Sequence, residues 1–377
     1  MRKVYEERQD CCGCGACKDI CPVGAIRMAS DQEGFWYPQV DASRCIDCGR
    51  CEKVCPVKHS EGTDPAGETL YCFGGRAEED GVREQSSSGG IFPLLAEYVL
   101  SRQGFVYGAA YNEQMEVVHG EASSMAELDA LKRTKYVQSN MEGVYQKIEE
   151  RLKEGSLVLF VGTPCQTHAL RLFLGREYPA LIVVSLICYG VPSPGVWRSY
   201  VEYLEQKFGG KMTSFSFRDK RMQDNGHTCA FVIDGREHAT SLYQDPYCGM
   251  YFANAILRPS CHACKFCTTR RDSDFTIGDF WGIEKVRPDM DDGMGTSVVL
   301  LHSERASQVF EEVKGKLAWF ACEKKDVLQP RLLAPTPAWK RRGRFWFWYG
   351  KLPFSLFQRL FMLCRHTGAL WGRFRKK

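Results

Sequence analysis

Two runs of four cysteines near the N-terminus share the spacing Cys-x2-Cys-x2-Cys-x3-Cys-Pro. This spacing is typical of bacterial two-cluster modules, in which the fourth cysteine of each run ligates the cluster of the other run. Zinc sites, the alternative, usually use separated Cys-x2-Cys pairs. We therefore expect one [4Fe-4S] cluster on Cys11, Cys14, Cys17 and Cys55, and a second on Cys45, Cys48, Cys51 and Cys21. Cys12 is expected to be a spare thiol and not a ligand.

A third group, Cys261, Cys264 and Cys267, has a spacing suited to a cluster or to zinc but lacks a fourth ligand nearby. Two distant cysteines at the ends of apolar runs are candidates for it, Cys165 in GTPCQ and Cys188 in LICYG. The Thr-Pro before Cys165 predicts a helix start, whose positive end favours a thiolate. Cys165 is thus suited to be a ligand or a nucleophile, and the alternative is a small buried residue.

Residues 86–90, Ser-Ser-Ser-Gly-Gly, directly precede a predicted helix over residues 91–101. Hydroxyl groups and free backbone N–H groups then converge on a helix N-terminus, which suits an anion such as a flavin pyrophosphate. An ordinary helix cap explains the same residues equally well. No Gly-x-Gly-x-x-Gly motif follows a predicted strand, so a Rossmann-type dinucleotide site is not indicated.

The chain has 377 residues, of which 44% are hydrophobic, enough for one large domain and a small module. Its net charge of +4 combines +11 in residues 338–377 with −7 in the remainder. The charged first ten residues and the lack of an 18-residue apolar run predict neither a secretory signal nor a membrane span. We expect a cytoplasmic protein whose basic tail could also hold it at the inner face of the membrane.

Four regions are expected along the chain. Residues 1–60 should form an α+β ferredoxin-like two-cluster module with a hairpin over 25–40, and the polar segment 61–69 a linker. Residues 70–337 should form an α/β body with a mixed, partly parallel sheet, because 157–162 and 180–190 are apolar runs with a helix over 167–175 between them. Further helices are expected over 125–154 and 308–317. Residues 338–377 should form a basic amphipathic helical tail.

The combination of motifs resembles the coenzyme F-420 hydrogenase/dehydrogenase beta-subunit family, in its bacterial form with a fused ferredoxin domain. The motifs are, in order, the double cysteine run, SSSGGIFPLLAEYVLS, KRTKYVQS, FVGTPCQTHAL, LICYGVPSP, FSFRDK, RPSCHACKFC and SDFTIGDFWG. They cover about residues 8–285. One departure is Tyr189, where the family pattern commonly has histidine after cysteine, so a proton-transfer role for that histidine is lost.

The resemblance implies FAD in the body, contacted by Ser87, Ser88, Gly89 and Gly90 and by the segment Lys135-Tyr136. It also implies a third [4Fe-4S] cluster on Cys261 and Cys264, with Cys165 and Cys188 as the remaining ligands and Cys267 as the substitute. A flavin exchanges two electrons as hydride and passes them singly to clusters. We therefore expect an oxidoreductase that connects a protein such as ferredoxin with a small-molecule substrate or a deazaflavin-like coenzyme.

Lys135, Arg218 and Lys220 are the cations expected to act near the flavin ring, where they could stabilise a reduced flavin or bind an acidic substrate. As alternatives, the segment FRDK could be a solvated turn and Lys135 a charge at a helix end. A competing interpretation is a non-catalytic electron-transfer subunit that docks on a partner enzyme through its tail. The tail could instead cover the body's own core. No nucleic-acid partner is expected, since no such motif accompanies the charge.

Overall fold

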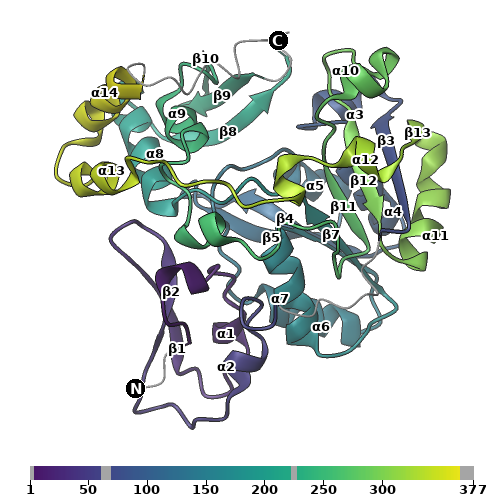
Figure 1. Cartoon of the computed structure of the whole chain (residues 1–377), viewed down its shortest axis with the longest axis horizontal. Coiled ribbons are helices and arrows are strands. Elements are labelled where there is room, and N and C mark those ends of the chain that lie inside the picture. The colour runs from purple at the N-terminus through teal and green to yellow at the C-terminus, as the bar shows by residue number, and fades with distance from the viewer. Residues whose placement is uncertain (1–3, 61–68, 222–226, 366–377) are drawn as a thin grey trace.

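The computed structural model describes residues 4–60, 69–221 and 227–365 (Figure 1). The linker predicted at 61–69 lies outside the described residues except for Thr69, as do the last twelve residues of the tail. Among the described helices, none is long and apolar enough to cross a membrane.

The N-terminal unit is a small β structure with short helices at its cysteine runs. Strands β1 (Ile26–Ser30) and β2 (Trp36–Val40) form the expected antiparallel hairpin. Helices α1 (Ala16–Asp19) and α2 (Arg50–Lys53) each begin after a left-handed glycine, and η1 (Arg8–Asp10) precedes the first run. Gly15 and Gly49, with φ of 79° and 73°, supply a backbone conformation that other residues adopt at a cost.

The body is built on an eight-stranded mixed sheet of order β13-β3-β12-β11-β7-β6-β4-β5. Neighbours β4, β6, β7 and β11 run parallel, and the pairs of β12 with β11 and β3, of β13 with β3, and of β5 with β4 are antiparallel. The partly parallel sheet expected from the apolar runs is therefore confirmed. The strands are β3 (Tyr71–Ala77), β4 (Phe105–Tyr111), β5 (Val117–Ala122), β6 (Val158–Gly162), β7 (Leu181–Leu186), β11 (Phe275–Asp279), β12 (Ser297–Leu301) and β13 (Leu317–Ala321).

Helices cover both faces of this sheet, which explains why β6 and β7 read as continuous apolar runs. Leu159 and Val161 pack with α4 (Ile91–Leu100), α5 (Met125–Leu131) and α11 (Glu304–Val313). Val158 and Phe160 point to the other face, toward α6 (Val144–Lys153) and α7 (Pro164–Leu174). The N-terminal unit lies beside α6 and α7 (Figure 1).

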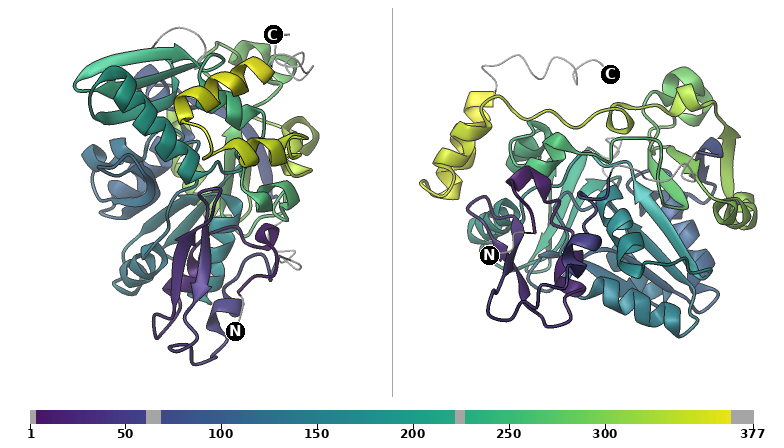
Figure 2. Two further views of the ribbon diagram at one scale, coloured as in Figure 1. Left: turned by 90° about the vertical axis from the view of Figure 1, so that its left-hand side faces the viewer. Right: turned by 60° about the horizontal axis from the view of Figure 1, so that its bottom comes forward.

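A second core joins a smaller antiparallel sheet to the tail. The sheet has the order β10-β9-β8 and packs with α8 (Pro194–Phe208) and α9 (Pro246–Phe252). The strands are β8 (Met212–Asp219), β9 (Thr228–Ile233) and β10 (Arg236–Ser241). Tail helices α13 (Arg342–Trp348) and α14 (Phe354–Arg365) bury Phe345, Phe357 and Phe361 in this core, and Figure 2 shows them beside α8.

Short helices complete the chain. They are α3 (Asp80–Glu84), η3 (Pro259–Ala263), α10 (Ile283–Val286), η4 (Pro288–Met290), η5 (Lys314–Lys316), α12 (Lys324–Val327) and η6 (Pro330–Leu332).

Two helix predictions need correction. The stretch 125–154 is not one helix, because residues 132–143 leave the helical conformation and Asn140 bridges to Val118 beside β5. The late helix lies at 304–313 and not at 308–317, since Ser303 caps its start and Leu317 begins β13. In the first case a tertiary contact overrides local helix propensity, and in the second a local cap sets the start of the helix.

Candidate functional site

Loops that carry predicted site residues meet at one edge of the large sheet. Strands β3, β11, β7, β6 and β4 all point the same way, so their carboxyl ends share that edge. Cys165 follows β6, Cys188 follows β7 and Asp279 ends β11. The carboxyl edge of parallel strands is where α/β proteins commonly hold ligands.

Six cysteines from four separate segments line one cavity, which we call the cysteine cavity. They are Cys12, Cys165, Cys188, Cys261, Cys264 and Cys267. Cys165, Cys188 and Cys261 each interact electrostatically with Cys264, and Cys261 also does so with the other two. Cys267 hydrogen-bonds to Cys264. The structure thus brings together the four ligands expected for a third cluster and places the substitute beside them.

The two N-terminal ligand sets also assemble as the spacing predicts. Cys21, Cys45, Cys48 and Cys51 line a second cavity, at the open end of the hairpin. In the other set, Cys55 interacts electrostatically with Cys11, and Cys17 does so with both. The fourth cysteine of each run therefore lies with the three cysteines of the other run.

The chemistry of these donor sets fits iron–sulfur clusters. Burial raises the pKa of Cys17, and the thiolates of Cys11 and Cys55 raise it further. Burial, with the thiolates of Cys165 and Cys264, raises the pKa of Cys188 to about 12. Crowded buried thiols hold their protons unless a cation compensates the negative charge, and iron supplies that compensation. Backbone N–H groups already point at two sulfurs, from Ala25 to Cys21 at 3.2 Å and from Val191 to Cys261 at 3.3 Å.

Cys12 joins the first cysteine run to the cysteine cavity. Its thiol makes hydrogen-bonding contacts with both Cys14 and Cys165. Around it the backbone of the run is held by the body, because Gln138 Nε2 donates to the Cys12 carbonyl at 3.1 Å and the Tyr145 hydroxyl donates to the Cys14 carbonyl at 3.0 Å. The Cys12 thiol thus lies between Cys14, a predicted ligand of the N-terminal unit, and Cys165, a predicted ligand of the body.

Residues 86–90, which we call the serine loop, contact Lys220 and the residue that precedes Lys135. Ser87 accepts a hydrogen bond of 2.8 Å from the Thr134 N–H, next to Lys135. Lys220 donates to the Ser88 carbonyl at 2.7 Å. Gly89 donates to the Ser297 hydroxyl at 3.0 Å, and Gly90 caps α4 with φ of 87°. The serine loop therefore lies at a helix N-terminus, as predicted.

Arg218 and Tyr136 lie together in the same region. Arg218 forms an ion pair with Asp279 and a side-chain hydrogen bond with Tyr136. Tyr136 stacks on Tyr251, with ring centroids 4.8 Å apart, and burial raises its pKa to about 12. The alternative that Arg218 belongs to a solvated turn is wrong, since it lies on β8 and pairs with the end of β11.

Lys135 and Lys220 are cations whose ammonium groups bond to carbonyl oxygens. Lys135 donates to the carbonyls of Ala130 and Lys132 at 2.8 and 2.7 Å. These carbonyls lie at the end of α5, so its contacts are those of a charge at a helix end, the alternative considered from the sequence. Burial and Arg133 lower the pKa of Lys135 to about 7, while burial, Arg218 and Arg83 lower that of Lys220 to about 8. Neither lysine has a carboxylate within 4.0 Å in the described part of the chain. Lysines that lack a carboxylate partner and have a lowered pKa suit an anionic ligand such as a flavin phosphate, which would supply the opposite charge.

These cysteine sets define an iron–sulfur protein. Residues 10–59 match the model of a 4Fe-4S dicluster domain, and residues 155–324 match the model of the C terminus of the coenzyme F420 hydrogenase/dehydrogenase beta subunit. Residues 155–324 thus carry the C-terminal region of this beta-subunit family and residues 10–59 a dicluster domain, and the resemblance drawn from the motifs is confirmed. The serine loop and Lys135 precede the second matched region.

Among solved structures, the chain is similar to one chain of the xenon-derivatised F420-reducing [NiFe] hydrogenase complex from Methanosarcina barkeri. The two are 18% identical, the similarity covers 71% of this chain and 86% of that chain, and the TM-score is 0.46. No curated protein matches the chain.

Sequence reasoning missed two residues at the junction of the N-terminal unit and the body. Cys12 is expected from spacing to be a spare thiol, yet it contacts Cys165. Arg258 stands out in the sequence only by its place shortly before Cys261, yet it is fully buried against Cys11. The only sequence signal for either residue is a nearby ligand cysteine.

Proposed function

We propose that this chain is an iron–sulfur flavoprotein that transfers electrons between its N-terminal [4Fe-4S] clusters and FAD, and exchanges hydride with a small substrate or a deazaflavin-like coenzyme. The observation that carries the proposal is the cysteine cavity. It receives Cys12 from the N-terminal unit and Cys165, Cys188, Cys261 and Cys264 from the body, which supports a third [4Fe-4S] cluster between the two parts.

Cluster and flavin supply the redox chemistry when bound, since a flavin takes two electrons as hydride and clusters carry one at a time. The residues of the chain hold and tune these groups. Cys165, Cys188, Cys261 and Cys264 would ligate the third cluster. The serine loop, Lys135 and Tyr136 would bind FAD, and Lys220 would place a positive charge at an anionic part of it.

Arg218 has a different role in this proposal. It is fixed by Asp279 at the end of β11 and by Tyr136, so its charge is oriented between the two sheets. A cation held there would stabilise a negatively charged reduced flavin or position an acidic substrate.

Anaerobic purification with quantification of iron, sulfide and flavin tests the proposal. About twelve irons and one FAD per chain are expected, since each cluster contributes about four irons. About eight irons without flavin would contradict the third cluster and the catalytic role together. Adding reduced ferredoxin and following hydride transfer to a deazaflavin then tests the direction of electron flow and the substrate class.

A second candidate function is a non-catalytic electron-transfer subunit that docks on a partner enzyme. The supporting observation is that Phe347, Trp348 and Leu363 are exposed on the tail, although other tail aromatics are buried. The two functions differ in turnover by the isolated chain. Flavin-loaded protein that exchanges electrons with one-electron dyes but never with a hydride donor or acceptor would favour the docking function.

A further inference from the structure

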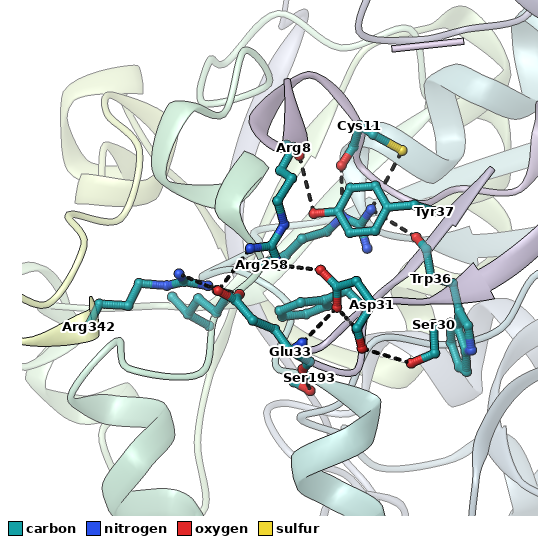
Figure 3. Close-up of polar contacts among 12 residues, drawn as sticks. Arg8, Cys11, Ser30, Asp31, Glu33, Trp36, Tyr37, Ser193, Arg258 and Arg342 are labelled. Atoms are coloured by element: carbon teal, nitrogen blue, oxygen red, sulfur yellow. Dashed lines mark hydrogen bonds and ion pairs between the residues drawn. The ribbon is translucent and has the colours of Figure 1, made fainter. Parts of the chain in front are cut away.

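The side chain of Arg258 is 0% exposed, although it lies between the N-terminal unit and the body. Its guanidinium donates from Nε to the Cys11 carbonyl at 2.7 Å and from Nη2 to the Trp36 carbonyl at 3.0 Å (Figure 3). Nη1 donates to Gln138 Oε1 at 3.0 Å. Nη2 also lies 3.5 Å from the sulfur of Cys11. One side chain therefore contacts both the backbone and the thiol of a predicted cluster ligand.

Arg258 differs from the other arginines of this network in having no acidic partner. Arg8 pairs with Asp31 and Glu33, and Arg342 pairs with Glu33 (Figure 3). For Arg258, no carboxylate lies within 4.0 Å among residues 4–60, 69–221 and 227–365. An arginine stays charged in proteins, and a buried charge is retained only where an opposite charge compensates it.

The nearest group able to carry the opposite charge through a cluster is the Cys11 sulfur, 3.5 Å from Nη2. Burial acts to lower the pKa of Arg258, and Cys11, Tyr37, Cys12 and Cys261 act to raise it. The rings of Tyr37 and Phe35 lie 4.2 and 5.4 Å from the guanidinium carbon and shield it from water. The natural counter-charge of Arg258 is therefore the anionic cluster that Cys11 ligates.

We propose that Arg258 is a positioning residue whose fixed charge raises the reduction potential of the cluster on Cys11, Cys14, Cys17 and Cys55. Reducing a cluster adds one negative charge, and a cation held against a ligand sulfur in a water-poor site stabilises that charge. The cluster on Cys21, Cys45, Cys48 and Cys51 lies outside these contacts, so its potential does not depend on Arg258. This inference rests on the two N-terminal clusters of the proposed function.

The test is a redox titration of the anaerobically purified holoprotein, followed by low-temperature electron paramagnetic resonance. In Arg258→Met, one of the two N-terminal clusters should become at least tenfold harder to reduce, equivalent to a potential lower by about 59 mV for one electron. Arg258→Lys keeps the charge and should restore most of that difference. Arg342→Gln removes an arginine already paired with Glu33 and should shift neither cluster.

Several outcomes separate this inference from the proposed function. Arg258→Met with full iron content and unchanged potentials would show a purely structural clamp and overturn the inference alone. Wild-type protein without N-terminal clusters would overturn the proposed function as well.

If Arg258→Met loses its iron, the variant Gln138→Glu tests the inference instead. It places a carboxylate about 3.0 Å from Nη1 and so pairs the charge of the guanidinium without removing the side chain. The same single cluster must then become harder to reduce than in Gln138→Ala. Equal potentials in these two variants would overturn the inference.

Discussion

The ammonium group of Lys220 lies 2.7 Å from the backbone carbonyl of Ser88 and donates a hydrogen bond to it. Lys220 follows β8 of the small sheet, whereas Ser88 belongs to the serine loop that precedes α4. A second bond, of 2.9 Å, runs from Lys220 to the Arg83 carbonyl. The two sheets are thus connected at the place where we propose that FAD binds.

We predict that FAD affinity decreases as pH rises from 7 to 9. Burial lowers the pKa of Lys220 to about 8, so its ammonium is charged below that pH and becomes neutral above it. An anionic flavin phosphate then loses its counter-charge. Titration of the apoprotein with FAD, followed by flavin fluorescence, measures this. Lys220→Arg should reduce the pH dependence to the part that comes from Lys135, whose pKa is about 7, because arginine stays charged. An unchanged dependence in that variant would exclude Lys220 as its cause.

The same depressed pKa makes a prediction for stability. Between pH 8 and 10.5 the unfolded state binds more protons at Lys220 than the folded state, so this residue's contribution to the free energy of unfolding increases with pH. Lys220→Met should remove that increase, as measured by chemical unfolding of the flavin-free protein at pH 8 and pH 10. Equal pH dependence in both proteins would contradict the shifted pKa.

Replacing a ligand of the cysteine cavity should remove one cluster. In Cys165→Ser we expect about four fewer irons per chain, because a [4Fe-4S] cluster is lost when a ligand is removed. Cys72→Ser is the matched control, since Cys72 lies on β3 and does not line the cavity. Iron and sulfide analysis distinguishes them, and full iron content in Cys165→Ser would assign the fourth ligand elsewhere.

Gly13 should tolerate a side chain far less than Gly143. Both have positive φ, 69° and 74°, so alanine costs about 1–2 kcal/mol at either position. A Cβ on Gly13 would lie 2.4 Å from Gln138 Nε2 and 2.7 Å from Arg258 Nη1, whereas nothing lies within 4 Å at Gly143. We expect Gly13→Ala to lose about 1–3 kcal/mol more of unfolding free energy. Equal losses of unfolding free energy in urea for the two variants would mean that Gln138 and Arg258 can move away from the added methyl group.

The tail should act as part of the body's core. Phe345 is 4% exposed and Phe347 is 57% exposed, on the same helix α13. We expect Phe345→Ala to lower the free energy of unfolding by about 3–5 kcal/mol, and Phe347→Ala to change it by less than about 0.5 kcal/mol. Thermal and chemical unfolding of the holoprotein compare them. A small effect of Phe345→Ala would indicate that the tail is dispensable for folding and free for docking.

Local spacing is sufficient wherever the chemistry is contained in a short segment. The two cysteine runs predict their ligand sets because, in this two-cluster spacing, three closely spaced thiolates of one run and the fourth of the other hold each cluster. The apolar runs around β6 and β7 indicate strands buried on both faces, since such strands show no polar alternation. The helix prediction for residues 132–143 is wrong because their contact with β5 is not visible in local propensity.

By itself, the sequence determined the cluster spacing, the helix start before Cys165 and the resemblance to the beta-subunit family. Only the tertiary structure decided that Cys165, Cys188, Cys261 and Cys264 meet in one cavity, because this depends on the parallel order of β6, β7 and β11. It also decided that Arg258 reaches Cys11, 247 positions away in the chain. Contacts between distant segments follow from strand order and packing, which no local pattern of residues encodes.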